Sequence, residues 1–268
     1  MKIVWIGGDG LRHKYYLNAI NSVYPVAGII QEKREGGVSE LAPKPPENIS
    51  SHDKKNFELH FLNRKNADEK HFKEVSLPDC RIHKVTKETL NNSDTKKFIE
   101  DINPDLVLIY GCHLIYEPIF SILPKHTINL HAGLSPKYRG SATLFWPFVF
   151  LEPNFAGVTF HRILDKADAG DIIHQSVPKL ESSDKIHDVA CKAIIQASYD
   201  MQKLIHKLLN GQKWDFHEQK FSGKQFMVND FRAEHLRIVY DLYKDNMVKE
   251  YLNGDLSSKE PKLIKQII

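Results

Sequence analysis

The start of the chain is the feature that most constrains its fold. An apolar run from Lys2 to Ile6 leads into the turn residues Gly7 to Gly10 and then into a helical pattern through Val23. A short strand, a glycine turn and a helix in this order open a Rossmann-like unit. Farther along, Leu106 to Tyr110 is a continuous apolar run, which is typical of a buried parallel strand. We therefore predict an α/β fold, with a mostly parallel, twisted sheet and helices on both faces.

The alternation of strand and helix patterns continues to about residue 210. Further strands are predicted at residues 26–31, 81–85, 126–130, 157–161 and 171–177, and further helices at residues 56–72, 93–102, 141–150 and 184–209. The glycine turn is not G-x-G-x-x-G, and no acidic residue stands at a convincing end of the second strand. A dinucleotide site is therefore weakly supported. Residues 32–56 form one long polar, proline-rich insertion.

The composition becomes more polar after Gly211. A hairpin turn is predicted at residues 221–224 and a short amphipathic helix at residues 231–243. We therefore divide the chain into a main domain, residues 1–210, and a C-terminal extension, residues 211–268, that forms a small hairpin and helix appendage. The hairpin-like stretch is compatible with a homodimer.

The composition also excludes several classes of function. The 37 Lys and Arg residues nearly balance the 34 Asp and Glu residues, and a net charge of +3 argues against a nucleic-acid partner. The 14 histidines contain no HExxH pair, so no metal site is predicted. Cys80, Cys112 and Cys191 are an odd, widely spaced set, which indicates reduced thiols and a cytoplasmic protein. The N-terminus does not read as a signal peptide, and no apolar stretch reaches the roughly 18 residues that a membrane span needs.

Polar residues suited to carbonyl chemistry gather between Thr127 and Asp171. Asn129 and His131 are two residues apart at the end of a predicted strand, so their side chains point to the same face. Asp168 lies in the turn after the next strand in this stretch. An amide, an imidazole and a carboxylate together suit attack on a carbonyl by an external nucleophile. Taken singly, each residue also has an ordinary structural explanation, as a strand-end asparagine, a loop histidine and a turn aspartate.

The motifs around these residues resemble those of the 10-formyltetrahydrofolate-dependent formyltransferases. They are Asn129-Leu130-His131, Ser135-Pro136, Tyr138-Arg139-Gly140, Gly157-Val158-Thr159 and Asp168-Ala169-Gly170-Asp171. The resemblance implies that Asn129, His131 and Asp168 are catalytic in the transfer of a formyl group to a primary amine. The family's usual loop, His-Pro-Ser-Leu-Leu-Pro, is replaced by residues 131–136, His-Ala-Gly-Leu-Ser-Pro. This change keeps the three catalytic residues and alters the loop that follows His131.

The resemblance also implies where the two substrates bind. The pterin ring of 10-formyltetrahydrofolate is expected at Leu114, Ile115 and Tyr116, in the loop after residues 106–110, and at the aspartate turn with Asp165 and Asp168. The acceptor is expected at Gly8, Asp9, Gly10 and Arg12, and Tyr138 and Arg139 are expected to contact either the acceptor or the folate. Judged from the residues alone, residues 111–116 also fit a hydrophobic turn that packs on the core. The glycine turn also fits a tight turn without a ligand, and residues 137–139 also fit a solvated basic turn.

The resemblance also implies which acceptor is expected, because the branches of the family differ in their tails and insertions. Residues 211–268 are too short for the barrel of the tRNA formyltransferases, and the insertion at residues 32–56 differs from the compact glycinamide ribonucleotide enzyme. A nucleotide-linked amino sugar, carrying dTDP or GDP, is the expected acceptor, as in the synthesis of lipopolysaccharide and other surface polysaccharides. Another small amine or deformylation by water are alternatives within the family. A folate- or nucleotide-binding module without catalysis is the alternative from another class.

Overall fold

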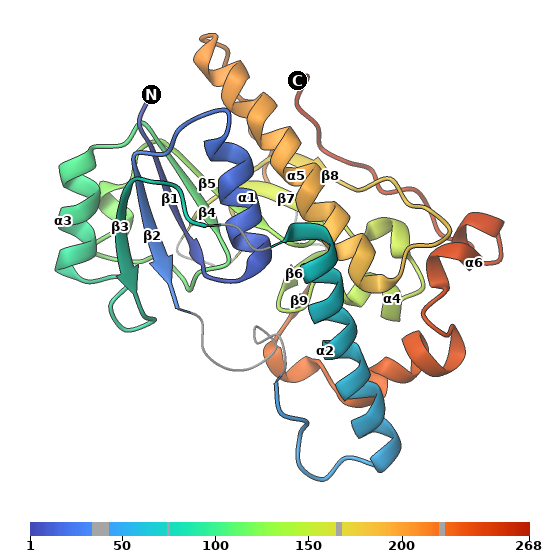
Figure 1. The fold of residues 1–268 in the computed structure, drawn as a ribbon. Helices are drawn as coiled ribbons and strands as arrows, with labels where there is room; N and C mark the ends of the chain where they lie inside the picture. The colour runs from blue at the N-terminus through green and yellow to red at the C-terminus, as the bar shows by residue number, and fades with distance from the viewer. Residues whose placement is uncertain (34–42, 74–75, 165–167, 220–222) are drawn as a thin grey trace.

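The computed structural model describes residues 1–33, 43–73, 76–164, 168–219 and 223–268. A seven-stranded sheet with the order β3-β2-β1-β4-β5-β7-β8 forms its centre (Figure 1). The strands are β1 (Ile3–Gly8), β2 (Gly28–Glu32), β3 (Arg81–Val85), β4 (Leu106–Tyr110), β5 (His126–His131), β7 (Val158–Arg162) and β8 (Ile172–Ser176). The first five are parallel, whereas β7 and β8 are antiparallel to their neighbours. This arrangement confirms the predicted α/β fold with a mostly parallel sheet.

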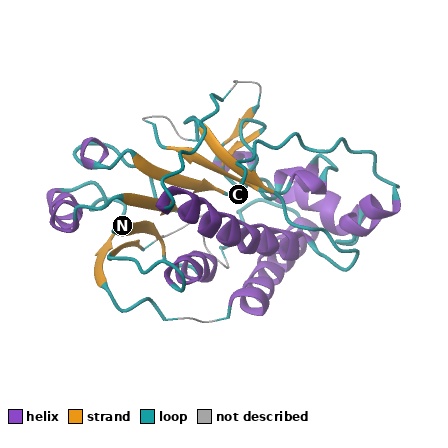
Figure 2. Cartoon of the chain, turned by 90° about the horizontal axis from the view of Figure 1, so that it is seen from above, coloured by secondary structure: helices purple, strands orange, loops and turns teal. Residues whose placement is uncertain are grey.

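Helices cover both faces of the sheet, as the view along it shows (Figure 2). On one face, α1 (Leu11–Asn21), α2 (Ser51–Phe72) and α5 (Ile186–Leu209) contribute to the larger hydrophobic core. On the other face, α3 (Ser93–Ile102) packs its Ile99 and Ile102 into a smaller core with Val4 and Ile109. Within the described ranges, no helix combines the length and the apolar character that a membrane crossing requires.

Two element boundaries differ from the sequence prediction for local reasons. Helix α2 begins at Ser51 rather than Asn56, because the Ser50 hydroxyl accepts a hydrogen bond of 3.0 Å from the Asp53 amide and caps the helix there. The apolar stripe that guided the prediction starts only at Phe57. Strand β2 extends to Glu32, whose side chain is fully buried, so an acidic residue does stand at the end of the second strand.

The predicted helix at residues 141–150 is shorter in the structure, and the one at 231–243 is divided. Only α4 (Trp146–Val149) is α-helical in the first region. The second region contains a 3-10 turn, Ala233–His235, and a π-helical turn, Ile238–Leu242. In such short segments, tertiary packing rather than helix propensity decides the backbone conformation.

The C-terminal extension does not form the expected hairpin in its described part. Residues 220–222, at the predicted turn, lie outside the described residues, and β9 (Lys224–Phe226) pairs in parallel with β6 (Tyr138–Gly140). The extension then packs on α2, where Arg237 contacts Asp53 at 2.6 Å and the Tyr240 hydroxyl lies 3.0 Å from Nδ1 of His60. A last helix, α6 (Met247–Asn253), precedes the C-terminal tail, residues 254–268.

The tail runs beside β8 at the edge of the sheet. The Gln175 amide donates to the Ile264 carbonyl at 2.7 Å, and the buried Gln266 side chain donates to the Ile173 carbonyl at 2.9 Å. The tail therefore occupies backbone groups that an edge strand would otherwise leave unpaired.

Candidate active site

The three predicted catalytic residues converge at the carboxyl end of β5. Asn129 and His131 lie on β5, and Asp168 lies in the turn between β7 and β8. Nδ1 of His131 is 3.2 Å from Oδ1 of Asp168. Parallel strands place their carboxyl ends at one edge of the sheet, where α/β proteins bind ligands. The prediction that these side chains meet is therefore supported by their positions.

A second histidine, His161 on β7, completes the cluster and was not predicted from the sequence. The antiparallel register pairs Asn129 with His161, and Nδ2 of Asn129 lies 3.0 Å from Nε2 of His161. The Arg162 carbonyl, 2.6 Å from Nδ1 of His161, can only accept, so Nδ1 donates to it and Nε2 is placed to accept from Asn129. Nε2 also lies 3.5 Å from Asp168. An asparagine amide has two hydrogens, so one remains for a substrate oxygen.

The backbone around Asp168 holds its carboxylate in place. The Gly140 amide donates to Oδ2 of Asp168 at 3.1 Å, and Nε2 of Gln219 donates to the Asp168 carbonyl at 2.8 Å. Asp168 itself has a φ of 50°, a left-handed conformation that aspartate tolerates better than most residues. At Gly170, an added Cβ would lie 1.8 Å from the Arg162 carbonyl oxygen, so the turn requires glycine there. Gln219, which sequence analysis did not identify, is thus part of the support for the site.

The electrostatics of the pair favour a protonated His131. Burial alone would lower the pKa of His131, but the carboxylate of Asp168 outweighs burial and raises it. Burial would likewise raise the pKa of Asp168, but the neighbouring His131 outweighs burial and holds it well below its usual range. Nε2 of His131 contacts the Tyr138 carbonyl at 2.9 Å, and a carbonyl can only accept. Both ring nitrogens therefore act as donors, which is the pattern of an imidazolium ion.

This pair predicts a pH-dependent contribution to stability. A raised histidine pKa stabilises the fold fully below the ordinary value of 6.5, and the contribution is lost as the pH rises through the raised value. We expect Asp168→Asn to reduce the free energy of unfolding more at about pH 6 than at about pH 9, because His131, which loses the carboxylate as its partner, carries its positive charge at the lower pH. Urea denaturation at both values measures the difference. Equal losses at both values would contradict the ion pair.

The loop after β4 presents apolar side chains at the same edge of the sheet. Leu114 and Tyr116 are 54% and 59% exposed, whereas Ile115 between them is buried. Two exposed apolar side chains around one buried anchor form a surface that a flat ring can cover, and the binding of the pterin by this loop stays a prediction. Asp165, the other predicted contact, lies outside the described residues.

The residues predicted to contact the acceptor fall into two groups. Gly8, Asp9 and Gly10 lie where β1 leads into α1. This is the same edge of the sheet as the three predicted catalytic residues, Asn129, His131 and Asp168, which we call the triad. Arg12 follows on α1, but its guanidinium group forms a 2.6 Å ion pair with the buried carboxylate of Asp68 on α2. Its side chain is therefore committed to joining two helices.

Tyr138 and Arg139, on β6, are both buried. The Tyr138 ring stacks on Phe226, and its hydroxyl donates to Glu152. Its side chain thus belongs to the core, and Tyr138 meets the triad through its carbonyl, which accepts from His131. Tyr138 and Arg139 therefore do not form a solvated basic turn, which was the alternative prediction for them.

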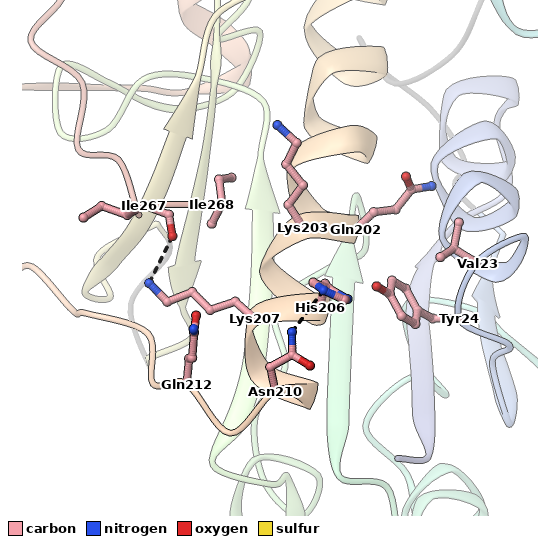
Figure 3. Close-up of a pocket in the computed structure, with 10 residues that line it drawn as sticks. All are labelled: Val23, Tyr24, Gln202, Lys203, His206, Lys207, Asn210, Gln212, Ile267 and Ile268. Atoms are coloured by element: carbon pink, nitrogen blue, oxygen red, sulfur yellow. Dashed lines mark hydrogen bonds between the residues drawn. The ribbon is translucent and has the colours of Figure 1, made fainter.

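A groove of about 530 Å³ lies away from this site, beside the C-terminal ends of α1 and α5 (Figure 3). It is lined by Val23, Tyr24, Gln202, Lys203, His206, Lys207, Asn210, Gln212, Ile267 and Ile268. His206 and Lys207 belong to the last turn of α5, where positive charge interacts favourably with the helix carbonyls. Lys207 also donates to the Ile267 carbonyl at 3.3 Å. Lys207 therefore has a structural explanation, and none of Asn129, His131 and Asp168 lines the groove.

Comparison with known proteins gives the family. The family described as formyl transferase matches residues 25–199, which include the whole cluster around His131. The chain belongs to the formyl transferase family. The match extends from just before β2 into α5, so membership rests on the part of the sheet that carries the candidate site.

Solved structures of formyl transferases share the fold at low sequence identity. A phosphoribosylglycinamide formyltransferase from Anaplasma phagocytophilum has a TM-score of 0.55 at 14% identity, over 84% of this chain and 96% of that chain. A 4-N formyltransferase from Francisella tularensis has a TM-score of 0.54 at 16% identity, over 86% and 78%. The formyltransferase PseJ from Anoxybacillus kamchatkensis, in complex with UDP-4,6-dideoxy-4-formamido-L-AltNAc and tetrahydrofolate, has a TM-score of 0.50 at 17% identity, over 93% and 97%.

Proposed function

We propose that this protein transfers the formyl group of 10-formyltetrahydrofolate to a primary amine of a nucleotide-linked amino sugar. The observation that carries the proposal is the contact between Asp168 and His131 beside the Asn129 amide, at the carboxyl edge of the sheet. An amide donor and an imidazolium ion side by side suit a carbonyl oxygen that becomes negative. Family membership supports formyl transfer, and the PseJ complex with tetrahydrofolate supports a folate donor.

The proposed reaction uses the cluster as an oxyanion site. The folate supplies a formyl group on nitrogen, and the amine nitrogen of the acceptor forms the new bond to its carbon. As the carbonyl electrons move to oxygen, Asn129 donates its second amide hydrogen and His131 contributes positive charge. The tetrahedral intermediate then expels the folate nitrogen, which takes up a proton, while the attacking amine loses one.

His131 has a specific requirement in this reaction. Both of its nitrogens are engaged, so a direct hydrogen bond to the substrate requires Nε2–H to leave the Tyr138 carbonyl. Asp168 keeps Nδ1–H bound and holds the ring as a cation during that exchange. His161 accepts from Asn129 and fixes the orientation of its amide. The side chains of Asn129, His131, His161 and Asp168 therefore act as one unit.

A nucleotide-linked amino sugar is the proposed acceptor class. The complex of PseJ contains a UDP-linked formamido sugar, and the Francisella tularensis structure is that of a 4-N formyltransferase. In this chain, the turn from Gly8 to Gly10 lies at the same edge of the sheet as the triad, and its glycines let backbone amides approach an anionic group such as a phosphate.

A formylation assay tests the proposal. We expect the purified protein, incubated with 10-formyltetrahydrofolate and a panel of dTDP-, GDP- and UDP-linked amino sugars, to increase the mass of at least one sugar by one formyl group. Mass spectrometry reads the product, and the same panel without the folate is the control. Folate binding without any formylated sugar would favour a binding module, and formylation of only a small amine would replace the acceptor class.

A further inference from the structure

The loop from Gly111 to Tyr116 is held by two side chains that are distant in sequence. Glu32, the last residue of β2, accepts from the His113 amide at 2.8 Å, and its other oxygen contacts Nδ1 of His113. Asn91, just before α3, donates to the Leu114 carbonyl and accepts from the Tyr116 amide, both at 3.0 Å. Three backbone groups of one short loop are thus bound by carboxylate and carboxamide atoms.

The reach of Glu32 depends on the end of β1. The sheet order places β1 between β2 and β4, and the register puts Glu32 beside Gly8. A Cβ at Gly8 would lie 3.1 Å from the Gly111 carbonyl and 3.1 Å from the His13 ring, so the space there is tight. The buried carboxylate of Glu32 therefore reaches across the end of β1 to His113 in the loop after β4.

Asn91 acts at the other end of the loop. Its carboxamide places a donor nitrogen and an acceptor oxygen in one plane, and both atoms bind the loop backbone. The next residue, Asn92, has a different task, since its side chain accepts from the Thr95 amide at 2.9 Å and caps α3. Asn91 therefore positions the loop, whereas its neighbour Asn92 caps α3.

We propose that Glu32 and Asn91 are positioning residues that set the folate-binding loop before the folate arrives. This inference rests on the proposed function. By fixing the backbone on both sides of buried Ile115, they hold Leu114 and Tyr116 outward. Ordering a loop costs conformational entropy, so a loop that is already ordered binds its ligand more tightly. Neither residue acts on the reacting atoms.

The test compares Asn91→Ala with Asn92→Ala. We expect Asn91→Ala to raise KM for 10-formyltetrahydrofolate about tenfold, the change that one or two newly mobile groups produce, with kcat and the acceptor KM unchanged. Asn92→Ala should lower Tm through the lost helix cap and leave KM for the folate unchanged. Glu32→Gln retains an acceptor for the His113 amide and should raise this KM less than Glu32→Ala does.

Folate affinity without turnover separates this inference from the proposed function. Isothermal titration of tetrahydrofolate into each folded variant, with circular dichroism as the check on folding, should show the same tenfold loss for Asn91→Ala. If the original protein binds tetrahydrofolate and Asn91→Ala binds it equally or more tightly, the inference alone is wrong. If the original protein does not bind it, both the proposed function and the inference fail.

Discussion

Replacing His131 with alanine is expected to lower kcat for formyl transfer by about a thousandfold. The variant loses the positive charge beside the carbonyl oxygen and leaves the Asp168 carboxylate without its main partner. KM for the folate should change little, because the side chain acts on the reacting group rather than on the pterin surface. Single-turnover transfer of formyl to the best acceptor measures the effect.

A matched variant shows whether the loss is specific. His206 lies on the exposed side of α5, in its last turn, and no triad residue contacts it. We expect His206→Ala to retain the original rate. Circular dichroism and Tm establish that His131→Ala is folded. A folded His131→Ala protein that transfers formyl at the original rate would remove the imidazole from the mechanism.

The substitution Asp168→Asn should be almost as damaging, with kcat lower by about a hundred- to a thousandfold. The amide has the shape of the carboxylate and keeps an oxygen for the Gly140 amide, so the turn is retained. It lacks the charge that raises the pKa of His131, so the ring becomes neutral at neutral pH. The expected result is a folded protein with an uncharged histidine.

Asp171→Asn is the control for this substitution. Asp171 lies in the same turn, and its contribution is a backbone carbonyl that accepts from the Arg162 amide at 3.0 Å. Its side chain can change without altering that bond, so kcat should stay close to the original value. If Asp171→Asn and Asp168→Asn lose the same activity, the effect belongs to the turn and not to the carboxylate of Asp168.

The sequence predicted the sheet and the triad because both depend on local patterns. The apolar run Leu106–Tyr110 indicates a buried strand from its own residues. Asn129 and His131 lie on the same face through strand geometry alone. The motif around Asp168 added the third residue through resemblance. Family membership is confirmed by the match over residues 25–199. The roles of the individual site residues stay predictions.

The parts that were missed depend on register and on contacts between distant segments. His161 joins the cluster only because β7 pairs with β5 in one register, and a shift of one residue would turn it to the other face. Glu32 was not recognised because its contact with His113 joins the ends of two strands that are not neighbours in the sheet. The parallel pairing of β6 with β9 joins segments about 85 residues apart, which no local pattern reveals.

The ionisation of His131 tests the account most directly. We propose titration of the ¹⁵N-labelled histidine ring by NMR in the original protein and in Asp168→Asn, with His131→Ala identifying the signal. The account predicts that His131 titrates above 6.5 in the original protein and at a clearly lower pH in Asp168→Asn. A His131 that titrates at or below 6.5 in the original protein, unchanged by the substitution, would contradict it.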